Sequence, residues 1–562
     1  MRTNRLLGAA TALGALVLTL SGGCDIVANI GTYCVEGVDP GCGTGGAGGT
    51  TTSMGGGGTT TTSTGGGGTG GEPGCSPPAT QDCYTGPAGT KDVALCKGGT
   101  QACTEDGTWG PCEGEALPAL EDCAVPADED CNFGTGCSET VWGDVFGDAS
   151  VQRVNDIAFD AAGNLYAVGT FSGTLDFDGG QLIAASDDVF VAKLGPAGEH
   201  VWSRRYGDAA EQTANGVTVD SNGNTIVVGY FEGVMQVGDT MLTSSGGKDA
   251  FVLKLGPDGE KIWARRFGDA GVSQSVQDVA TDSQDNVILV GTSNGELDFD
   301  GKKIGAPGEV DGFVAKLNPS GSAVWAFPIG GTNSQYCTNL AVDSVGNVSV
   351  TGQFSGSITF SPGNTLTATG PDIYVARLDS AGGFLWAKKI DTLNNALPYG
   401  LIADSAGDII VSFETNSTTD AGGGTITPST YDTVLVKYSS GGVFQWQKQI
   451  GGTGDEYAPE MAVDPQKRPI VAFYTDGPVT IDGVDLPPGG GYDIVVAALE
   501  PSGDLLWAKR YGLISDQTSP VVAVGPKGQI GLGCLASGDI DFGTGALTTM
   551  GSDVALAVIG PN

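Results

Sequence analysis

Short runs of alternating apolar and polar residues, separated by glycine-rich turns, follow one another along the C-terminal three quarters of the chain. In one representative stretch, residues 216–220 alternate as a strand does, 221–224 have turn composition, and 225–230 are a second β-branched run. A third apolar run, 250–255, precedes the turn 257–259 and a fourth run. The pattern predicts four antiparallel strands in about 60 residues. Outside the N-terminal segment, no stretch shows the periodicity of a helix.

A tryptophan marks the same position in every copy of this pattern. The copies are separated by 60, 61, 62, 61, 60 and 61 residues, at Trp142, Trp202, Trp263, Trp325, Trp386, Trp446 and Trp507. Seven such units predict an all-β fold, a β-propeller of seven four-stranded blades. The first tryptophan run, 141–146, precedes the first complete unit, and the last unit ends after its third run, 554–559. We therefore expect the N-terminal strand to complete the last blade and close the ring.

Two recurring motifs link the repeats to a known family. Residues 190–196 read FVAKLGP, residues 313–319 read FVAKLNP, and residues 219–224 read VDSNGN. These units resemble the bacterial seven-bladed β-propeller repeats of secreted and surface proteins (the SBBP-type family). The resemblance covers residues 141–560 and implies the fold. It implies no particular reaction, because the family has none in common.

The N-terminus has the features of an export signal, which we assign to residues 1–23. Arg2 and Arg5 precede an apolar run, 6–20, and small residues follow up to Cys24. This arrangement resembles a bacterial lipoprotein signal, which implies lipidation of Cys24. The alternative is an ordinary secretory signal. Both predict a protein of the cell envelope, lipid-anchored at the outer membrane or cell surface, or secreted, with no membrane contact beyond the anchor.

Three segments separate this signal from the propeller, which we assign to residues 138–562. Residues 24–42 form a short N-terminal segment, and 43–74 are almost only Gly, Thr and Ser, as in a flexible linker. Residues 75–137 are predicted to form a small module held by disulfides, as expected in an oxidising compartment. Its connectivity is left open by the sequence. The disulfide candidates are Cys34, Cys42, Cys75, Cys83, Cys96, Cys103, Cys112, Cys123, Cys131 and Cys137.

Charge and composition restrict the function. Lys and Arg number 26 against 65 Asp and Glu, so the net charge is −39, which argues against nucleic-acid binding. The single histidine, His200, leaves no Ser-His-Asp set or histidine-based metal cluster. We therefore expect a non-enzymatic, monomeric binding platform for an unknown protein or glycan. The alternatives are a quinone-dependent dehydrogenase, a carboxylate-based polysaccharide hydrolase or lyase, and a structural envelope protein.

An aspartate recurs 18 or 19 residues after six of the seven tryptophans. A ring of carboxylates suggests calcium, but the D-x-x-G-N pattern is also that of a tight turn in which aspartate caps its own backbone. The turn interpretation needs no ion, and we favour it, which leaves no cofactor. The residues are Asp160, Asp220, Asp282, Asp343, Asp404 and Asp464.

A second recurring set lies 9 to 11 residues after each tryptophan, in the loops that enter the innermost strands. Amide side chains offer both donors and acceptors, so such a ring at the mouth of the central channel is a candidate for binding a sugar or peptide. The alternative is a solvated loop position that recurs because the unit was duplicated. The residues are Gln152, Gln212, Gln274, Gln335, Asn395, Glu456 and Gln517.

Overall fold

The structure is a computed structural model that describes residues 75–85, 97–116, 139–305, 309–393 and 396–561. The described residues contain strands and turns but no helix, so none of them forms a helix that could cross a membrane. The predicted signal, Cys24, the segment 24–42 and the linker lie outside the described residues. So do Cys34, Cys42, Cys96, Cys123, Cys131 and Cys137.

The described part of the cysteine-rich segment contains one small antiparallel sheet and two disulfides. Strand β1 (Thr80–Cys83) pairs with β2 (Gly99–Ala102). Cys75 is bonded to Cys103, and Cys83 to Cys112. Two crosslinks around two four-residue strands agree with the predicted disulfide module, whose own apolar core is small.

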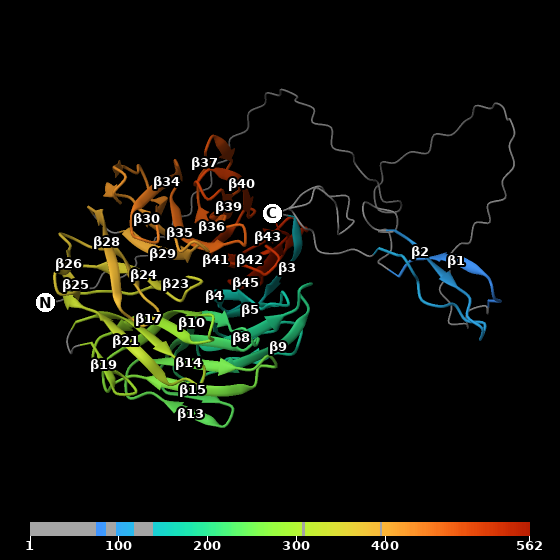
Figure 1. Cartoon of the computed structure of the whole chain (residues 1–562), viewed down its shortest axis with the longest axis horizontal. Helices are drawn as coiled ribbons and strands as arrows, with labels where there is room; N and C mark the ends of the chain where they lie inside the picture. Colours follow the sequence, from blue (N-terminus) through green and yellow to red (C-terminus); the bar gives the residue numbers. More distant parts are fainter. Residues whose placement is uncertain (1–74, 86–96, 117–138, 306–308, 394–395, 562) are drawn as a thin grey trace, which may run out of the picture. The chain divides into compact units, whose positions relative to one another are not determined.

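The rest of the described chain is a β-propeller, as predicted (Figure 1). Seven sheets contain four antiparallel strands in the same order, and we number them as blades one to seven along the chain. From the innermost to the outermost strand they are β4 (Gln152–Phe159), β5 (Leu165–Phe171), β8 (Asp188–Leu194) and β9 (His200–Tyr206); β10 (Gln212–Val219), β11 (Thr225–Phe231), β14 (Asp249–Leu255) and β15 (Lys261–Phe267); β16 (Gln274–Thr281), β17 (Val287–Ser293), β20 (Asp311–Leu317) and β21 (Ala323–Ile329); β23 (Asn339–Val342), β24 (Val348–Phe354), β27 (Asp372–Leu378) and β28 (Phe384–Thr392); β29 (Ala396–Ala403), β30 (Ile409–Thr415), β33 (Asp432–Tyr438) and β34 (Phe444–Gly452); β35 (Glu456–Val463), β36 (Pro469–Thr475), β39 (Asp493–Leu499) and β40 (Leu505–Tyr511); and β41 (Asp516–Val524), β42 (Ile530–Ser537), β45 (Asp553–Ile559) and β3 (Thr140–Phe146).

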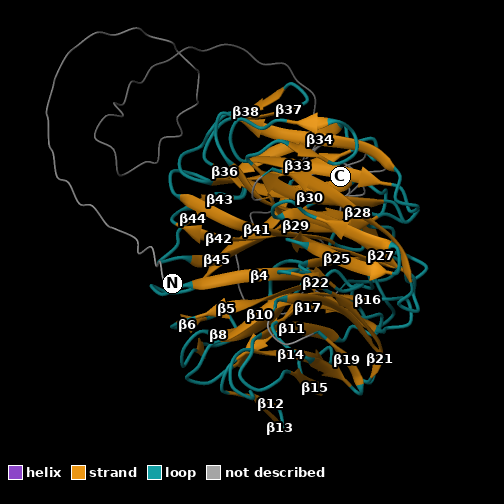
Figure 2. Cartoon of the chain, turned by 90° about the vertical axis from the view of Figure 1, so that its left-hand side faces the viewer, coloured by secondary structure: helices purple, strands orange, loops and turns teal. Residues whose placement is uncertain are grey.

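The remaining small sheets are hairpins between the second and third strands of each blade, which the sequence pattern did not reveal (Figure 2). Two of them, in blades four and five, continue the four-stranded sheet of the preceding blade, and that of blade four gains a strand from the preceding loop. In chain order they are β6 (Thr174–Leu175) with β7 (Leu182–Ile183), β12 (Val234–Val237) with β13 (Thr240–Thr243), β18 (Leu297–Phe299) with β19 (Lys302–Ile304), β25 (Ser357–Ser361) with β26 (Asn364–Thr367) and β22 (Gly331–Thr332), β31 (Thr419–Asp420) with β32 (Thr425–Ile426), β37 (Val479–Ile481) with β38 (Val484–Leu486), and β43 (Ile540–Asp541) with β44 (Ala546–Leu547).

The ring closes through the N-terminal strand, as predicted. β3 pairs with β45, so that Trp142 faces Val558 and Phe146 faces Val554. On the inner side, β41 of blade seven packs beside β4 of blade one. The sheet of the last blade is thereby made from both ends of the propeller sequence.

The hydrophobic core lies between blades rather than inside them. Seven buried clusters each join two neighbouring blades, for example Val168 and Val191 of blade one with Val227 and Phe251 of blade two. The third strands are buried along their whole length because a blade covers each face. The innermost strands face the central channel, so they position the candidate site.

Candidate functional site

The six turn aspartates end the innermost strands and are bonded on two sides. Asp220 Oδ1 accepts hydrogen bonds from the backbone N–H groups of Asn222 and Asn224, both at 2.9 Å. Its Oδ2 lies 2.7 Å from the ammonium of Lys254, and both side chains are buried. Burial raises the pKa of Asp220, but the Lys254 ammonium and the Asn224 hydrogen bonds outweigh it, and the pKa lies below its ordinary value. The equivalent pairs are Asp160–Lys193, Asp282–Lys316, Asp343–Arg377, Asp404–Lys437 and Asp464–Arg468.

The last two blades show that the aspartate and its cation change together. In blade six Ala498 holds the place of the lysine, and the cation is Arg468, which comes from the turn. In blade seven Gly525 replaces the aspartate and Val558 replaces the lysine. There the side-chain oxygen of Gln529 accepts the backbone N–H two residues before it, at 2.9 Å, as the aspartate does elsewhere. This joint replacement supports the turn interpretation, because either charge alone would be buried without a partner.

The tryptophans lie on the outermost strands and pack against the next blade. Trp202 Nε1 donates to the carbonyl of Pro257 at 2.9 Å, and its ring covers Gly259 of the same turn. Gly259 has a φ of +79°, and a Cβ there would lie 2.9 Å from the Trp202 ring, so the turn requires glycine. Four more tryptophans make the same hydrogen bond: Trp263, Trp325, Trp386 and Trp446. Blade packing therefore accounts for this residue, as predicted from the sequence.

The predicted amide ring is buried instead of lining the mouth of the channel. Gln212 shows the reason: its Nε2 donates to Asp208 Oδ1 at 2.9 Å and to the carbonyl of Glu232 at 3.0 Å, while its Oε1 accepts the Asp208 N–H at 3.0 Å. The side chain ties the loop that enters the blade to the end of the second strand. The prediction of a ligand-binding rim is therefore wrong for six residues, which are at most 1% exposed: Gln152, Gln212, Gln274, Gln335, Glu456 and Gln517. Asn395 lies outside the described residues.

Glu456 carries a carboxylate where these other blades carry an amide. Its Oε1 accepts a hydrogen bond from Thr475 at 3.1 Å, but its buried Oε2 has no partner. Burial raises the pKa of Glu456 to about 8, and the carboxylate of Asp432 adds to the effect. Between the ordinary pKa and about 8, the folded protein therefore holds a proton that the unfolded chain has lost, and stability falls as pH rises.

We expect Glu456→Gln to stabilise the propeller. The amide supplies the missing donor and removes the buried charge, so the free energy of unfolding should rise by about 1–2 kcal/mol at pH 8. At pH 4 the gain should be close to zero, because Glu456 is then protonated in both states. Urea unfolding at the two pH values measures the difference. An equal gain at both would show that ionisation of Glu456 has no part in it.

A second set of buried aspartates, not singled out from the sequence, begins the third strand of every blade. Asp249 Oδ2 accepts the backbone N–H of Ser245 at 2.8 Å and pairs with Arg266 at 2.5 Å. These carboxylates fix the end of the hairpin loop to the outermost strand. Their period, equal to that of the tryptophans, was the available signal: Asp188, Asp249, Asp311, Asp372, Asp432, Asp493 and Asp553.

The central channel contains a polar cavity of about 510 Å³ that is lined by the innermost strands of all seven blades. In six blades a bulge interrupts these strands. A bulge re-aims side chains and frees backbone groups from the ladder. Side chains of the preceding blade bind the freed groups: Asn215 Nδ2, for example, donates to the carbonyl of Val276 at 2.8 Å. The channel wall is therefore held together by polar contacts between blades.

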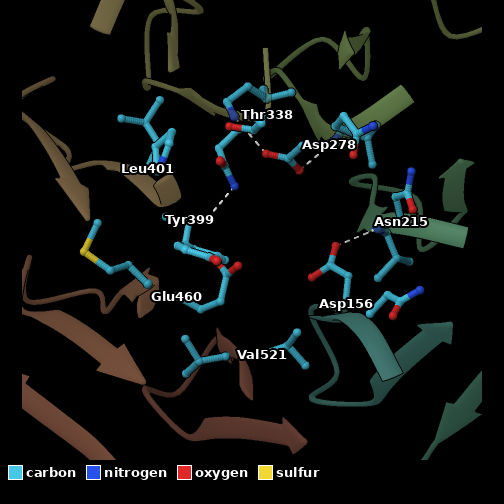
Figure 3. A pocket seen from close by; sticks show the side chains of 18 residues that line it. Asp156, Asn215, Asp278, Thr338, Tyr399, Leu401, Glu460 and Val521 are labelled. Atoms are coloured by element: carbon cyan, nitrogen blue, oxygen red, sulfur yellow. Dashed lines mark hydrogen bonds between the residues drawn. The ribbon is translucent and has the colours of Figure 1, made fainter. Parts of the chain in front are cut away.

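Three carboxylates, those of Asp156, Asp278 and Glu460, face this cavity from blades one, three and six (Figure 3). Asp156 Oδ2 accepts the backbone N–H of Val217 at 2.7 Å, and Asp278 Oδ2 accepts that of Leu340 at 2.8 Å. These two carboxylates also serve as links to the next blade. Glu460 differs, since no hydrogen bond joins it to another described residue.

The acids raise one another's pKa in the channel. Burial raises the pKa of Asp156 to about 8, with repulsion from Asp278 as the second cause. Burial raises the pKa of Asp278 to about 6. The pKa of Glu460 lies well above its ordinary range because of burial, then because of Asp156 and Asp278. The lining residues include no lysine, arginine or histidine that could compensate these charges.

This arrangement favours binding over a recognisable reaction. The lining residues include no histidine or cysteine, and no nucleophile is placed beside a base. Among the described residues, no group of three or more His, Cys, Asp or Glu side chains is placed to hold a metal ion. The sequence did not reveal the channel acids, because the same repeat position holds Gly216, Gly400 and Val521 in other blades.

Comparison with known proteins supports the repeat architecture and goes no further. No family model matches the chain. A stretch of 156 residues, 25% of this chain, is 31% identical to the uncharacterized WD repeat-containing protein L264 of Acanthamoeba polyphaga mimivirus. The match spans only 11% of that protein's length.

Several solved structures show similarity in fold at low sequence identity. The Pan2 WD40 domain of Neurospora crassa is 11% identical, with a TM-score of 0.37 over 73% of this chain and 89% of that one. The polysaccharide lyase Uly1 is 9% identical, with a TM-score of 0.40 over 74% and 91%. A protein of unknown function from Dyadobacter fermentans is 11% identical, with a TM-score of 0.34 over 75% and 99%. Enzymes and non-enzymes are both represented, so the chain is established as a β-propeller with WD-type repeats.

Proposed function

We propose that this protein is a cell-envelope binding protein that takes a basic group of its ligand into the central channel. The export signal and Cys24 would anchor it, residues 43–74 would act as a spacer, and the propeller would present the site. The observation that carries the proposal is the channel itself, where three carboxylates face a cavity whose lining includes no basic residue.

Charge complementarity supports a cationic ligand. Bringing an ammonium or guanidinium group between Asp156, Asp278 and Glu460 would replace mutual repulsion by attraction in a site of low dielectric. Glu460 has the leading role, because its carboxylate is not used to join blades. The net charge of −39 would also raise the rate at which a cation arrives.

The proposal predicts binding that depends on Glu460. Arginine amide and putrescine should bind the mature chain, and Glu460→Gln should weaken both by about tenfold or more, since it removes one partner of a buried charge pair. Calorimetric titration measures this. Glu456→Gln is the matched control, because it makes the same change four residues earlier on β35, where the side chain faces the blade interior, and it should leave binding unchanged.

Binding should also strengthen from pH 6 to pH 8. The raised pKa values of Asp156 and Glu460 mean that protons must leave before the carboxylates can pair with a cation. Titration in buffers of different ionisation enthalpy would detect this proton release. Binding of neutral oligosaccharides without any basic ligand, or full binding by Glu460→Gln, would contradict the channel site.

A further inference from the structure

Four tyrosines form a half-buried cluster on the face of the propeller where the loops enter the innermost strands of blades five and six. Tyr457 and Tyr474 lie on β35 and β36, and Tyr431 and Tyr492 directly precede β33 and β39. The ring centroids are 5.2 Å apart for Tyr431 and Tyr457, and 5.4 Å apart for both Tyr457–Tyr474 and Tyr474–Tyr492. The described residues contain no other tyrosine cluster of this size.

The surroundings of this cluster are acidic. The hydroxyl of Tyr457 donates to Asp455 Oδ2 at 2.9 Å, and the backbone N–H of Tyr492 donates to Asp516 Oδ1 at 3.1 Å. After burial, the groups that raise the pKa of Tyr492 are the carboxylates of Asp476, Asp455 and Asp516. Asp455 and Asp476 also line a cavity of about 320 Å³ beside the rings. Negative charge and aromatic surface therefore meet at one place.

Blade two shows what this combination of residues holds. There the ammonium of Lys248 lies 4.1 Å from the centre of the Tyr230 ring and 3.0 Å from Glu211 Oε1. The hydroxyl of Tyr230 donates to the same carboxylate oxygen at 2.6 Å. A cation on the face of an aromatic ring, paired with a carboxylate, is a favourable contact.

The same repeat positions in blade six lack the cation. Glu211 precedes Gln212 as Asp455 precedes Glu456, and Tyr230 and Tyr474 are the sixth residues of β11 and β36. Lys248 directly precedes the third strand of blade two, where blade six has Tyr492. Blade six thus keeps the carboxylate and the ring, replaces the internal ammonium by a further ring, and adds Asp476.

We propose that the tyrosine cluster of blades five and six binds an organic ammonium cation, the group that Lys248 supplies internally in blade two. Ring faces would contact the alkylammonium carbons, and Asp455 and Asp476 would balance the charge. The ammonium can belong to a lysine side chain of a protein partner or to a small alkylammonium compound. This site is separate from the channel, so it stands or falls independently of the proposed function.

The experiment measures binding of choline and of a trilysine peptide to the full chain, with 3,3-dimethyl-1-butanol as the uncharged analogue of choline. Tyrosine fluorescence and calorimetry are the readouts. We expect at least one cation to bind and the neutral analogue to bind at least tenfold more weakly. Choline binding alone identifies a small-molecule ligand, and peptide binding alone identifies a protein partner. Equal binding of the neutral analogue, or binding of neither cation, would overturn the site.

A reciprocal exchange between the blades gives the matched variants. Tyr492→Lys should place an internal ammonium beside Asp455 and abolish binding, while Lys248→Tyr should leave the blade-six site intact and create a second site in blade two. Asp455→Asn removes the charge with little change of shape and should weaken binding about tenfold, which keeps the test valid if Tyr492→Lys unfolds. Glu460→Gln should have no effect, which separates this site from the channel. Undiminished binding by both Tyr492→Lys and Asp455→Asn would refute the proposal.

Discussion

A chain that begins at residue 148 should melt at least about 10 °C below one that begins at residue 138. The ten residues removed include β3, whose pairing with β45 supplies the outermost strand of blade seven. Their loss exposes the buried side chain of Phe146 and removes Trp142 from Gly198 in the next blade. Each large side chain lost from a core costs about 3–5 kcal/mol, and β45 would become an exposed sheet edge. Differential scanning calorimetry of the two chains measures the difference.

The chain that begins at residue 138 is the control, because it lacks the signal, the linker and the cysteine-rich segment but keeps β3. Addition of a synthetic peptide of residues 138–147 to the shorter chain should restore part of the lost stability in a concentration-dependent way. Equal melting temperatures for the two chains would show that β3 does not close the ring.

The repeats explain how much of this fold could be predicted. Strand order, the closing strand and the packing role of the tryptophans all follow from one period and from where it starts and stops. The hairpins between second and third strands could not be predicted, because segments such as 174–183 are short and differ between blades in length and composition. Disulfide pairing in the cysteine-rich segment likewise depends on which strands meet, and the sequence does not specify that.

The error about the amide ring has a general physical cause. Recurrence was taken as a sign of exposure to a ligand, but a polar residue that recurs in every unit is more readily explained by a backbone group that every unit must satisfy. Gln152 and Gln212 bind the same loop atoms in blades one and two. Such residues are needed because buried donors and acceptors without partners are costly.

The candidate binding residues show the opposite behaviour. Asp156, Asp278 and Glu460 occupy a repeat position that holds glycine or valine in other blades, and Tyr492 stands where blade two has Lys248. A search for recurring residue types passes over such positions. In this propeller the constant positions build the scaffold, and the channel and loop positions that vary between blades are where recognition can differ from one blade to the next.

Asp220→Gly should be among the most destabilising single substitutions at the surface of any blade, with a loss of about 3–5 kcal/mol. It leaves the buried ammonium of Lys254 with no carboxylate and removes the acceptor for two turn N–H groups. The triple variant Asp220→Gly, Asn224→Gln and Lys254→Val copies the residues of blade seven and should recover most of the loss. Urea unfolding of the wild type, the single variant and the triple variant measures both effects.

Asp239→Gly is the matched control, since Asp239 pairs with Lys261 but is 86% exposed, and an exposed ion pair contributes at most about 1 kcal/mol. If the triple variant recovered nothing, the joint change at Gly525, Gln529 and Val558 would not be a compensation. A calcium-dependent melting temperature that disappears in Asp220→Gly would restore the calcium interpretation of the aspartates. Recovery without calcium would instead show that one buried charge requires the other, and that a blade is stable with both or with neither.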